Sequence, residues 1–203
     1  IKEDGSISKI ARIDDNGNIT CEMVDSAGQV QTGAYDLVPI LDSFITTHPD
    51  FSYKGAKAIL ALTGYDGLFG YRTNPSAETT FGATEYQSNI TAATDIARAL
   101  RASGYDLACY TYENSAYGQM DNAKIQYELN KWKSEVTPIL GDVDTLVFAL
   151  NSDISESTAP YSGEKIDTLL DFGFKKFLGF SAEAMNWFTE ADGYARLGRI
   201  QVT

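Results

Sequence analysis

The residues best suited to chemistry gather in a short loop, residues 63–73, which follows the apolar run 58–62. The loop holds a carboxylate, a guanidinium and two phenols, namely Asp66, Arg72, Tyr65 and Tyr71. An apolar run of this length predicts a buried strand. Ionisable groups at the end of such a strand, among glycines that let a ligand approach the main chain, are typical of a functional site. A glycine-rich connection that only turns the chain is the alternative, and the loop by itself leaves both open.

Comparable side chains follow three further strands, which the sequence predicts at residues 105–110, 145–150 and 174–180. Parallel strands place their carboxyl ends at one edge of a sheet, so these side chains are expected to form a common rim. Their mixture of hydroxyl, amide, carboxylate and aromatic groups suits a sugar, which needs hydrogen bonds for its hydroxyls and an aromatic ring for its C–H face. Turn formation and packing are the alternative roles. The candidate ligand-binding residues are Tyr71, Arg72, Tyr110, Thr111, Asn114, Asp153 and Trp187.

The first part of the chain differs in pattern from the rest. Residues 1–35 alternate apolar and polar side chains around Asn16-Gly17 and Ala27-Gly28, which predicts two or three short antiparallel strands. Residues 37–47 carry apolar side chains at helical spacing and are followed by Pro49, which predicts a helix. We interpret residues 1–49 as an N-terminal hairpin-and-helix appendage.

The remainder, residues 50–203, alternates strands with helices. Apolar periodicity predicts helices at residues 91–102, 121–140 and 163–172 between the four strands. This order is typical of parallel strands joined by crossover helices. The sequence therefore predicts an α/β sheet or an irregular barrel.

Composition narrows the classes of partner. The chain has 203 residues, 43% of them hydrophobic, and a net charge of -12 with a pI near 4.4. Such a charge argues against nucleic acid and against an anionic membrane surface. No run approaches the ~18 apolar residues of a membrane span, and the start at Ile1 without a signal-peptide pattern indicates a processed or trimmed chain. Cys21 and Cys109 are expected to be free thiols, although one disulfide is possible.

Several segments together resemble the polysaccharide deacetylases, the carbohydrate esterases of the NodB type. The resemblance is carried by residues 51–73, by the helix and strand within residues 91–110, and by KWKSEVTPILGDVDTLVFALNSDI, residues 131–154. It implies a distorted (β/α) barrel over residues 50–203, a carbohydrate or cell-wall polysaccharide as partner, and an extracellular or cell-surface location.

The resemblance also shows where this chain departs from the family pattern. It places Tyr65 at the position of the general-base aspartate and Asp66 at that of a metal-binding aspartate. Tyr110 and Asn114 fall at the positions of the two metal-binding histidines, and the chain has a single histidine, His48. Zinc is held by imidazole, thiolate and carboxylate groups, so we expect no zinc or other metal cofactor here. Calcium at Asp66 and Glu113 is conceivable, but the ligand spacing of a dedicated loop is absent.

These departures leave alternative functions open. In the first, the protein keeps a cleft for a carbohydrate or another cell-surface ligand without metal-dependent deacetylation. In the second, it is a hydrolase of N- or O-acetylated polysaccharide with a non-standard site made of Asp66, Tyr65 and Glu113. Asp66 would be the base, Glu113 the acid, and Arg72 or Tyr110 would stabilise the oxyanion. A purely structural or adhesive surface domain is a third possibility.

Overall fold

The chain is a mixed α/β protein whose strands form separate sheets. The computed structural model describes residues 9–181 and 186–200. Its strands form a three-stranded sheet, β1-β2-β3, and a six-stranded sheet with the order β4-β5-β6-β7-β9-β8. The chain divides into unit 1, residues 1–60 and 66–106, and unit 2, residues 61–65 and 107–203, so that the division passes through β4 and β5. Residues 1–49, interpreted above as an appendage, belong to unit 1.

The antiparallel sheet of unit 1 confirms the strands predicted near the N-terminus. It consists of β1 (Lys9–Ile13), β2 (Ile19–Val24) and β3 (Val30–Gly33). The turn between β1 and β2 depends on Asp14, whose carboxylate accepts hydrogen bonds from the backbone N–H groups of Asn16 and Asn18. Asp25 does the same after β2 for Ala27 and Gln29. Such side-chain turns explain why the hairpin signal was reliable.

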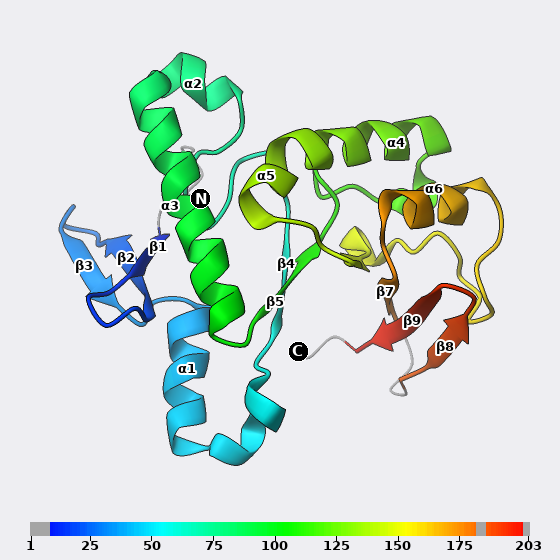
Figure 1. Ribbon diagram of the computed structural model, residues 1–203, viewed down its shortest axis with the longest axis horizontal. Helices are drawn as coiled ribbons and strands as arrows, with labels where there is room; N and C mark the ends of the chain where they lie inside the picture. Colours follow the sequence, from blue (N-terminus) through cyan, green and yellow to red (C-terminus); the bar gives the residue numbers. More distant parts are fainter. Residues whose placement is uncertain (1–8, 182–185, 201–203) are drawn as a thin grey trace. The chain divides into compact units, whose positions relative to one another are not determined.

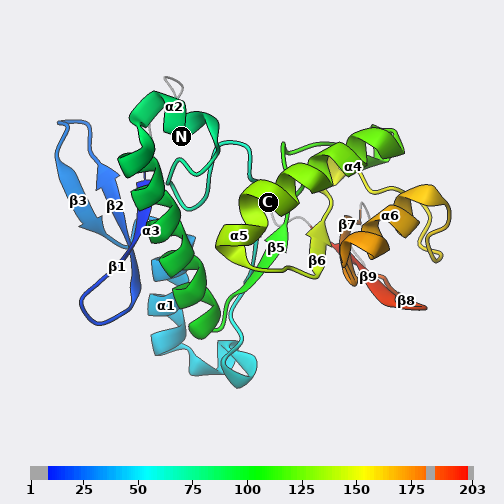
Figure 2. The ribbon, with the colours of Figure 1, turned by 45° about the horizontal axis from the view of Figure 1, so that its top comes forward.

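The helices of unit 1 are α1 (Leu37–Thr47), α2 (Ser76–Phe81) and α3 (Ala83–Ala102). Helix α1 has the predicted bounds, whereas α3 begins eight residues before the predicted residue 91 and α2 was not predicted. Figure 2 shows α3 beside the three-stranded sheet, and α3 contacts β1 and β2. Its buried side is made of Ala93, Ile96, Ala97 and Leu100.

Five strands of the larger sheet, β4, β5, β7, β8 and β9, are labelled in Figure 1, and β6 is labelled in Figure 2. Its strands are β4 (Ile59–Leu62), β5 (Asp106–Cys109), β6 (Thr145–Val147), β7 (Lys176–Phe180), β8 (Phe188–Ala191) and β9 (Tyr194–Arg199). The helices of unit 2 are α4 (Asn122–Lys131), a π-helical turn (Trp132–Val136), α5 (Thr137–Leu140) and α6 (Glu164–Phe172). Short 3-10 turns occur at Pro49–Phe51, Tyr53–Gly55, Tyr117–Gln119 and Ala149–Asn151.

The predicted parallel pairing is confirmed for β5 with β6 and for β6 with β7. The predicted (β/α) barrel is wrong. The described strands form an open sheet that ends at β4 on one side and at β8 on the other. The hairpin β8–β9, which was not among the predicted elements, forms this edge: β9 pairs in parallel with β7, and β8, which precedes β9 in the chain, runs antiparallel to it at the sheet edge.

Both cysteines are buried and free, as expected. Cys109 lies at the end of β5, where desolvation raises the pKa of its thiol well above the ordinary value. No helix within residues 9–181 and 186–200 is both long and apolar enough to cross a bilayer.

Within unit 1, the loop that carries Tyr71 is attached to strand β1. The N–H of Ala11 donates to the carbonyl of Phe69 at 3.0 Å, and the Tyr71 hydroxyl donates to the carbonyl of Ala11 at 2.8 Å. The same hydroxyl accepts a hydrogen bond from Arg12, whose guanidinium pairs with Glu22 at 2.8 Å. The Tyr71 side chain, a candidate ligand-binding residue, therefore has partners inside the fold.

We expect Tyr71→Phe to lower the free energy of unfolding by about 1–2 kcal/mol, because a half-buried carbonyl and a guanidinium each lose a hydrogen-bond partner. Urea denaturation monitored by circular dichroism measures this change. Tyr53→Phe is the matched control, since Tyr53 is 75% exposed in the same unit. A Tyr71→Phe protein as stable as the Tyr53→Phe protein would show that the hydroxyl does not anchor the loop.

Candidate functional site

A hollow of unit 2 lies where β6 and β7 end. Its volume is about 620 Å³, within the range of small-molecule sites. Three segments of the chain line it: the turn before α4, the stretch after β6, and the end of β7 with the residues that follow. The residues that line it are Gly118, Gln119, Leu150, Asn151, Ser152, Asp153, Ile154, Ser155, Glu156, Thr158, Phe180, Ser181 and Trp187.

The indole of Trp187 packs against two glycines. Gly179 of β7 and Gly198 of β9 are paired directly across the sheet. A Cβ atom at Gly198 would lie 2.6 Å from Trp187 Cε2, and one at Gly179 would lie 3.5 Å from Trp187 Cζ2. Real Cβ atoms do not come as close as the first of these distances, so Gly198 is required for the ring to lie where it does. Two adjacent strands of the sheet, without side chains at this point, thus leave room for one ring.

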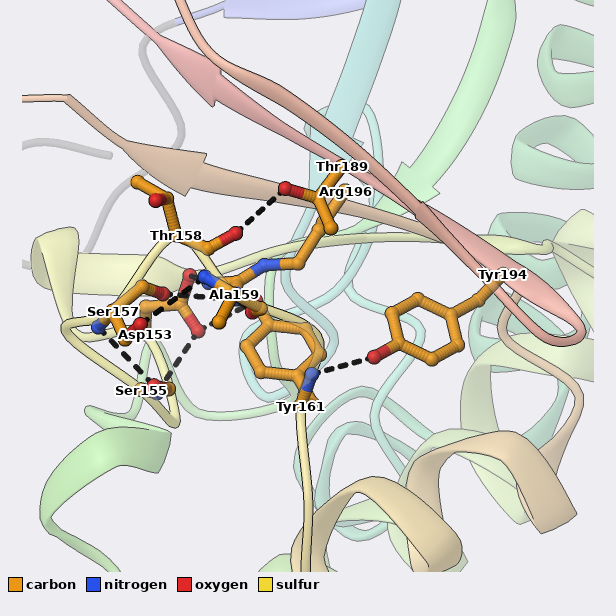
Figure 3. Close-up of polar contacts among 9 residues, drawn as sticks. All are labelled: Asp153, Ser155, Ser157, Thr158, Ala159, Tyr161, Thr189, Tyr194 and Arg196. Carbon is orange, nitrogen blue, oxygen red and sulfur yellow. Dashed lines mark hydrogen bonds and ion pairs between the residues drawn. The ribbon is translucent and has the colours of Figure 1, made fainter.

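Asp153 forms the charged wall of the hollow and is bound from behind. Its Oδ2 lies 3.1 Å from the Nη2 of Arg196, in an ion pair whose arginine side chain is 0% exposed and whose aspartate side chain is 11% exposed. The hydroxyl of Tyr161 lies 2.6 Å and 2.8 Å from the two carboxylate oxygens of Asp153. Figure 3 shows this network. These partners replace the hydrogen bonds to water that the carboxylate gives up on burial.

Tyr161 keeps its proton in this arrangement. Burial, together with the neighbouring negative charge of Asp153, raises the pKa of Tyr161 far above the ordinary value of a phenol. Its hydroxyl is therefore a hydrogen-bond donor to the carboxylate at any ordinary pH. The backbone N–H of Tyr161 donates in turn to the hydroxyl of Tyr194 at 2.6 Å, as Figure 3 also shows.

The loop after β5 is organised by a second buried charge. The carboxylate of Glu128, a residue of α4 that is 2% exposed, accepts hydrogen bonds from the N–H groups of Tyr112 and Glu113 at 2.9 Å and 3.2 Å. It also accepts one from the hydroxyl of Ser115 at 2.6 Å. Thr111 adopts a positive φ of 60° in this loop. The loop conformation is therefore held from the neighbouring helix.

The predicted catalytic residues lie in different surroundings. Asp66 belongs to unit 1 and pairs with Arg72 at 3.0 Å, with 42% of its side chain exposed. Tyr65 and Glu113 belong to unit 2. The ring of Tyr65 is exposed while its N–H donates to the carbonyl of Tyr112, and Glu113 is exposed on the loop held by Glu128. Arg72, a candidate ligand-binding residue, is thus occupied at least by the carboxylate of Asp66.

Of the predicted ligand-binding residues, the structure brings Asp153 and Trp187 together in the hollow. Thr111 is 0% exposed and its hydroxyl accepts from the N–H of Ser115 at 2.7 Å, which is a role within the loop. Asn114 is exposed in the same loop, and the ring of Tyr110 lies 5.8 Å from the guanidinium carbon of Arg199. None of these three lines the hollow.

Sequence reasoning missed the residues that support the hollow from beneath, namely Tyr161, Gly179, Arg196 and Gly198. A signal existed for the last two. Asp192-Gly193 separates two short runs, Phe188–Ala191 and Tyr194–Arg199, and Asp-Gly between such runs predicts a hairpin.

The metal positions implied by the resemblance do not fit zinc. They offer one carboxylate, one phenol and one amide, at Asp66, Tyr110 and Asn114, and the carboxylate is paired with Arg72. Zinc sites use imidazole, thiolate or carboxylate ligands, usually at least three of them. Throughout residues 9–181 and 186–200, no group of three or more His, Cys, Asp or Glu side chains is placed to hold a metal ion.

Comparison with family models, with curated proteins and with solved structures gave no match to this chain. The resemblance to polysaccharide deacetylases therefore stays a prediction from the sequence.

The chemistry open to the hollow is recognition through mixed contacts. The indole of Trp187, with Leu150, Ile154 and Phe180, supplies apolar surface, while amide, hydroxyl and carboxylate groups supply hydrogen bonds. A ligand that has a C–H face and several hydroxyl groups would satisfy both kinds of surface at once.

We expect Gly198→Ala to displace the indole of Trp187 and to lower the free energy of unfolding by about 1–3 kcal/mol, because the added methyl overlaps the ring. Near-UV circular dichroism reports the indole, and urea denaturation reports the stability. Leu197→Ala is the control, since Leu197 lies on the same strand and is 37% exposed. An unchanged near-UV spectrum for Gly198→Ala would contradict the packing of Trp187 against Gly198.

Proposed function

We propose that this protein binds carbohydrate in the hollow at the ends of β6 and β7. The observation that carries the proposal is the pairing of Trp187, flat on its two glycines, with a wall of polar side chains that includes Asp153. Aromatic rings beside convergent hydrogen-bonding groups form sites for molecules that are apolar on one face and polar at the edge. The predicted resemblance of residues 50–203 to enzymes of polysaccharides supports the same class of ligand.

Charge narrows the class of sugar. Among the described residues that line the hollow, Asp153 and Glu156 are acidic and none is lysine, arginine or histidine. Arg196 is fully buried and already paired with Asp153, so it offers no cation to a ligand. An acidic sugar would find no lining cation to pair with, and it would be repelled by Glu156. The proposed ligand is therefore a neutral glycan rather than a uronic acid or sulfated one.

The proposed function is binding without metal-dependent hydrolysis. The metal positions of the resemblance carry a poor donor set, and Asp66, the candidate base, is paired with Arg72. In metal-dependent deacetylases, the cation stabilises the transition state by roughly several kcal/mol. A cell-wall or other cell-surface polysaccharide is the partner that fits this proposal.

We expect Trp187→Ala to weaken binding of a neutral glycan by about tenfold, since the stacking surface is lost. Isothermal titration calorimetry with N-acetylated chitooligosaccharides measures the change, and oligogalacturonides of equal length serve as the acidic comparison. Tyr127→Ala is the matched control, because Tyr127 is an aromatic residue of α4 that is 57% exposed and outside the hollow. Equal losses in the two variants, or tighter binding of the acidic sugar, would contradict the proposal.

We expect no acetate to be released from the same chitooligosaccharides, with or without added zinc or cobalt. Enzymatic determination of acetate measures this directly. The Asp66→Asn variant is run in parallel, because the alternative function uses Asp66 as the base. Acetate release by the wild-type protein that disappears in Asp66→Asn would assign hydrolysis to this chain and overturn the proposal of binding alone.

A further inference from the structure

The walls of the hollow come from segments that have little regular structure of their own. One wall is the stretch after the turn Ala149–Asn151, and the other is Trp187, which precedes β8. The backbone of Trp187 is held by β9, because its carbonyl accepts a hydrogen bond from the N–H of Gly198 at 2.9 Å. The stretch that carries Asp153 is not a strand of the sheet, so its position relative to the indole depends largely on side-chain contacts.

The side chain of Arg196, from the middle of β9, contacts the first wall at several points. Its Nη2 pairs with Asp153 at 3.1 Å, and its Nη1 donates to the carbonyl of Ser157 at 2.9 Å and to that of Ala159. Figure 3 shows these bonds converging on one guanidinium. The planar fork of an arginine can make several such bonds at fixed angles, which an ammonium group cannot.

The same guanidinium lies over the aromatic ring of the second wall. Its central carbon lies 4.8 Å from the centre of the Trp187 ring and 3.6 Å from that of Tyr161. A cation over an aromatic ring is attracted by the electron-rich face of the ring, and the attraction is stronger where water is excluded. The arginine side chain is 0% exposed, so this condition is met.

We infer that Arg196 is the positioning residue of the hollow: it orients the indole of Trp187 and the Asp153 wall with respect to each other. This inference rests on the proposed function for its importance to binding, although the orientation itself is a property of the unliganded protein. Arg196 acts through Asp153 and Trp187 and does not line the hollow itself.

The cost of this arginine favours a role beyond filling space. A fully buried charge loses its hydration, and the Nε of Arg196 has no hydrogen-bond partner among the described residues. Well-packed apolar side chains often replace buried ion pairs without loss of stability. An apolar residue at this position of β9 would fill the space, but it would neither bind the two carbonyls nor pair with Asp153.

The test is Arg196→Lys, which keeps the charge that Asp153 needs and removes the planar fork. The first readout needs no ligand: the two indole N–H resonances in an NMR spectrum, with that of Trp187 assigned by its loss in Trp187→Phe. We expect the Trp187 resonance of Arg196→Lys to shift and broaden while that of Trp132 stays in place. The second readout is calorimetry with N-acetylated chitooligosaccharides, where we expect about tenfold weaker binding.

Ile125→Val is the control for a general loss of stability, since Ile125 is fully buried in α4 and outside the hollow. It should leave the Trp187 resonance and the affinity unchanged. An Arg196→Lys protein that is less stable but keeps both the wild-type Trp187 resonance and the wild-type affinity would overturn the inference. If the wild-type protein binds no glycan, the proposed function fails, and the resonance of Trp187 still decides whether Arg196 positions it.

Discussion

The buried ion pair between Arg196 and Asp153 is the constraint on which the arrangement of the candidate site depends. Neither charge would be stable there alone, because the loss of hydration would be uncompensated. The pair is stable because strong donors and acceptors are directed at it: the Tyr161 hydroxyl at the carboxylate, and the backbone carbonyls of Ser157 and Ala159 at the guanidinium. The loop after β6 therefore takes the course that brings its carbonyls to the arginine.

The same device appears at the neighbouring strand end. Glu128 of α4 is buried and accepts hydrogen bonds from two backbone N–H groups and one hydroxyl of the loop after β5. In both places a single charged side chain from a regular element replaces a ladder of backbone hydrogen bonds. The charges are matched to the groups they meet, since a carboxylate binds N–H groups and a guanidinium binds carbonyls. Loops fixed in this way can present side chains precisely without belonging to the sheet.

How far the sequence predicts this structure depends on where each element obtains its stability. The apolar runs of β5, β6 and β7 are buried, and Asp14 and Asp25 close the turns of the first sheet locally, so these elements were predicted. Strand β9 was not predicted, because its buried positions are occupied by Tyr194, Arg196 and Gly198 rather than by aliphatic residues.

The prediction of a barrel was wrong because the order of strands and helices does not determine whether the last strand closes on the first. Tyr71 and Thr111 were candidates by residue type, but both side chains serve the fold. Tyr71 binds the carbonyl of Ala11, 60 positions away, and Thr111 binds the N–H of Ser115 within its own loop.

The candidate pocket and the chemistry implied by the resemblance occupy different strand ends. Asp153 and Trp187 follow β6 and β7, whereas the metal positions, Asp66, Tyr110 and Asn114, follow β4 and β5. The arrangement of the hollow depends on Arg196 and the paired glycines, and none of Asp66, Tyr110 and Asn114 lines it. The metal that the resemblance implies for its relatives would polarise an acetyl group, whereas the indole, the carboxylate wall and the buried arginine of the hollow are held by contacts within the protein. The proposed binding of sugar and the hydrolysis implied by the resemblance would therefore depend on different side chains.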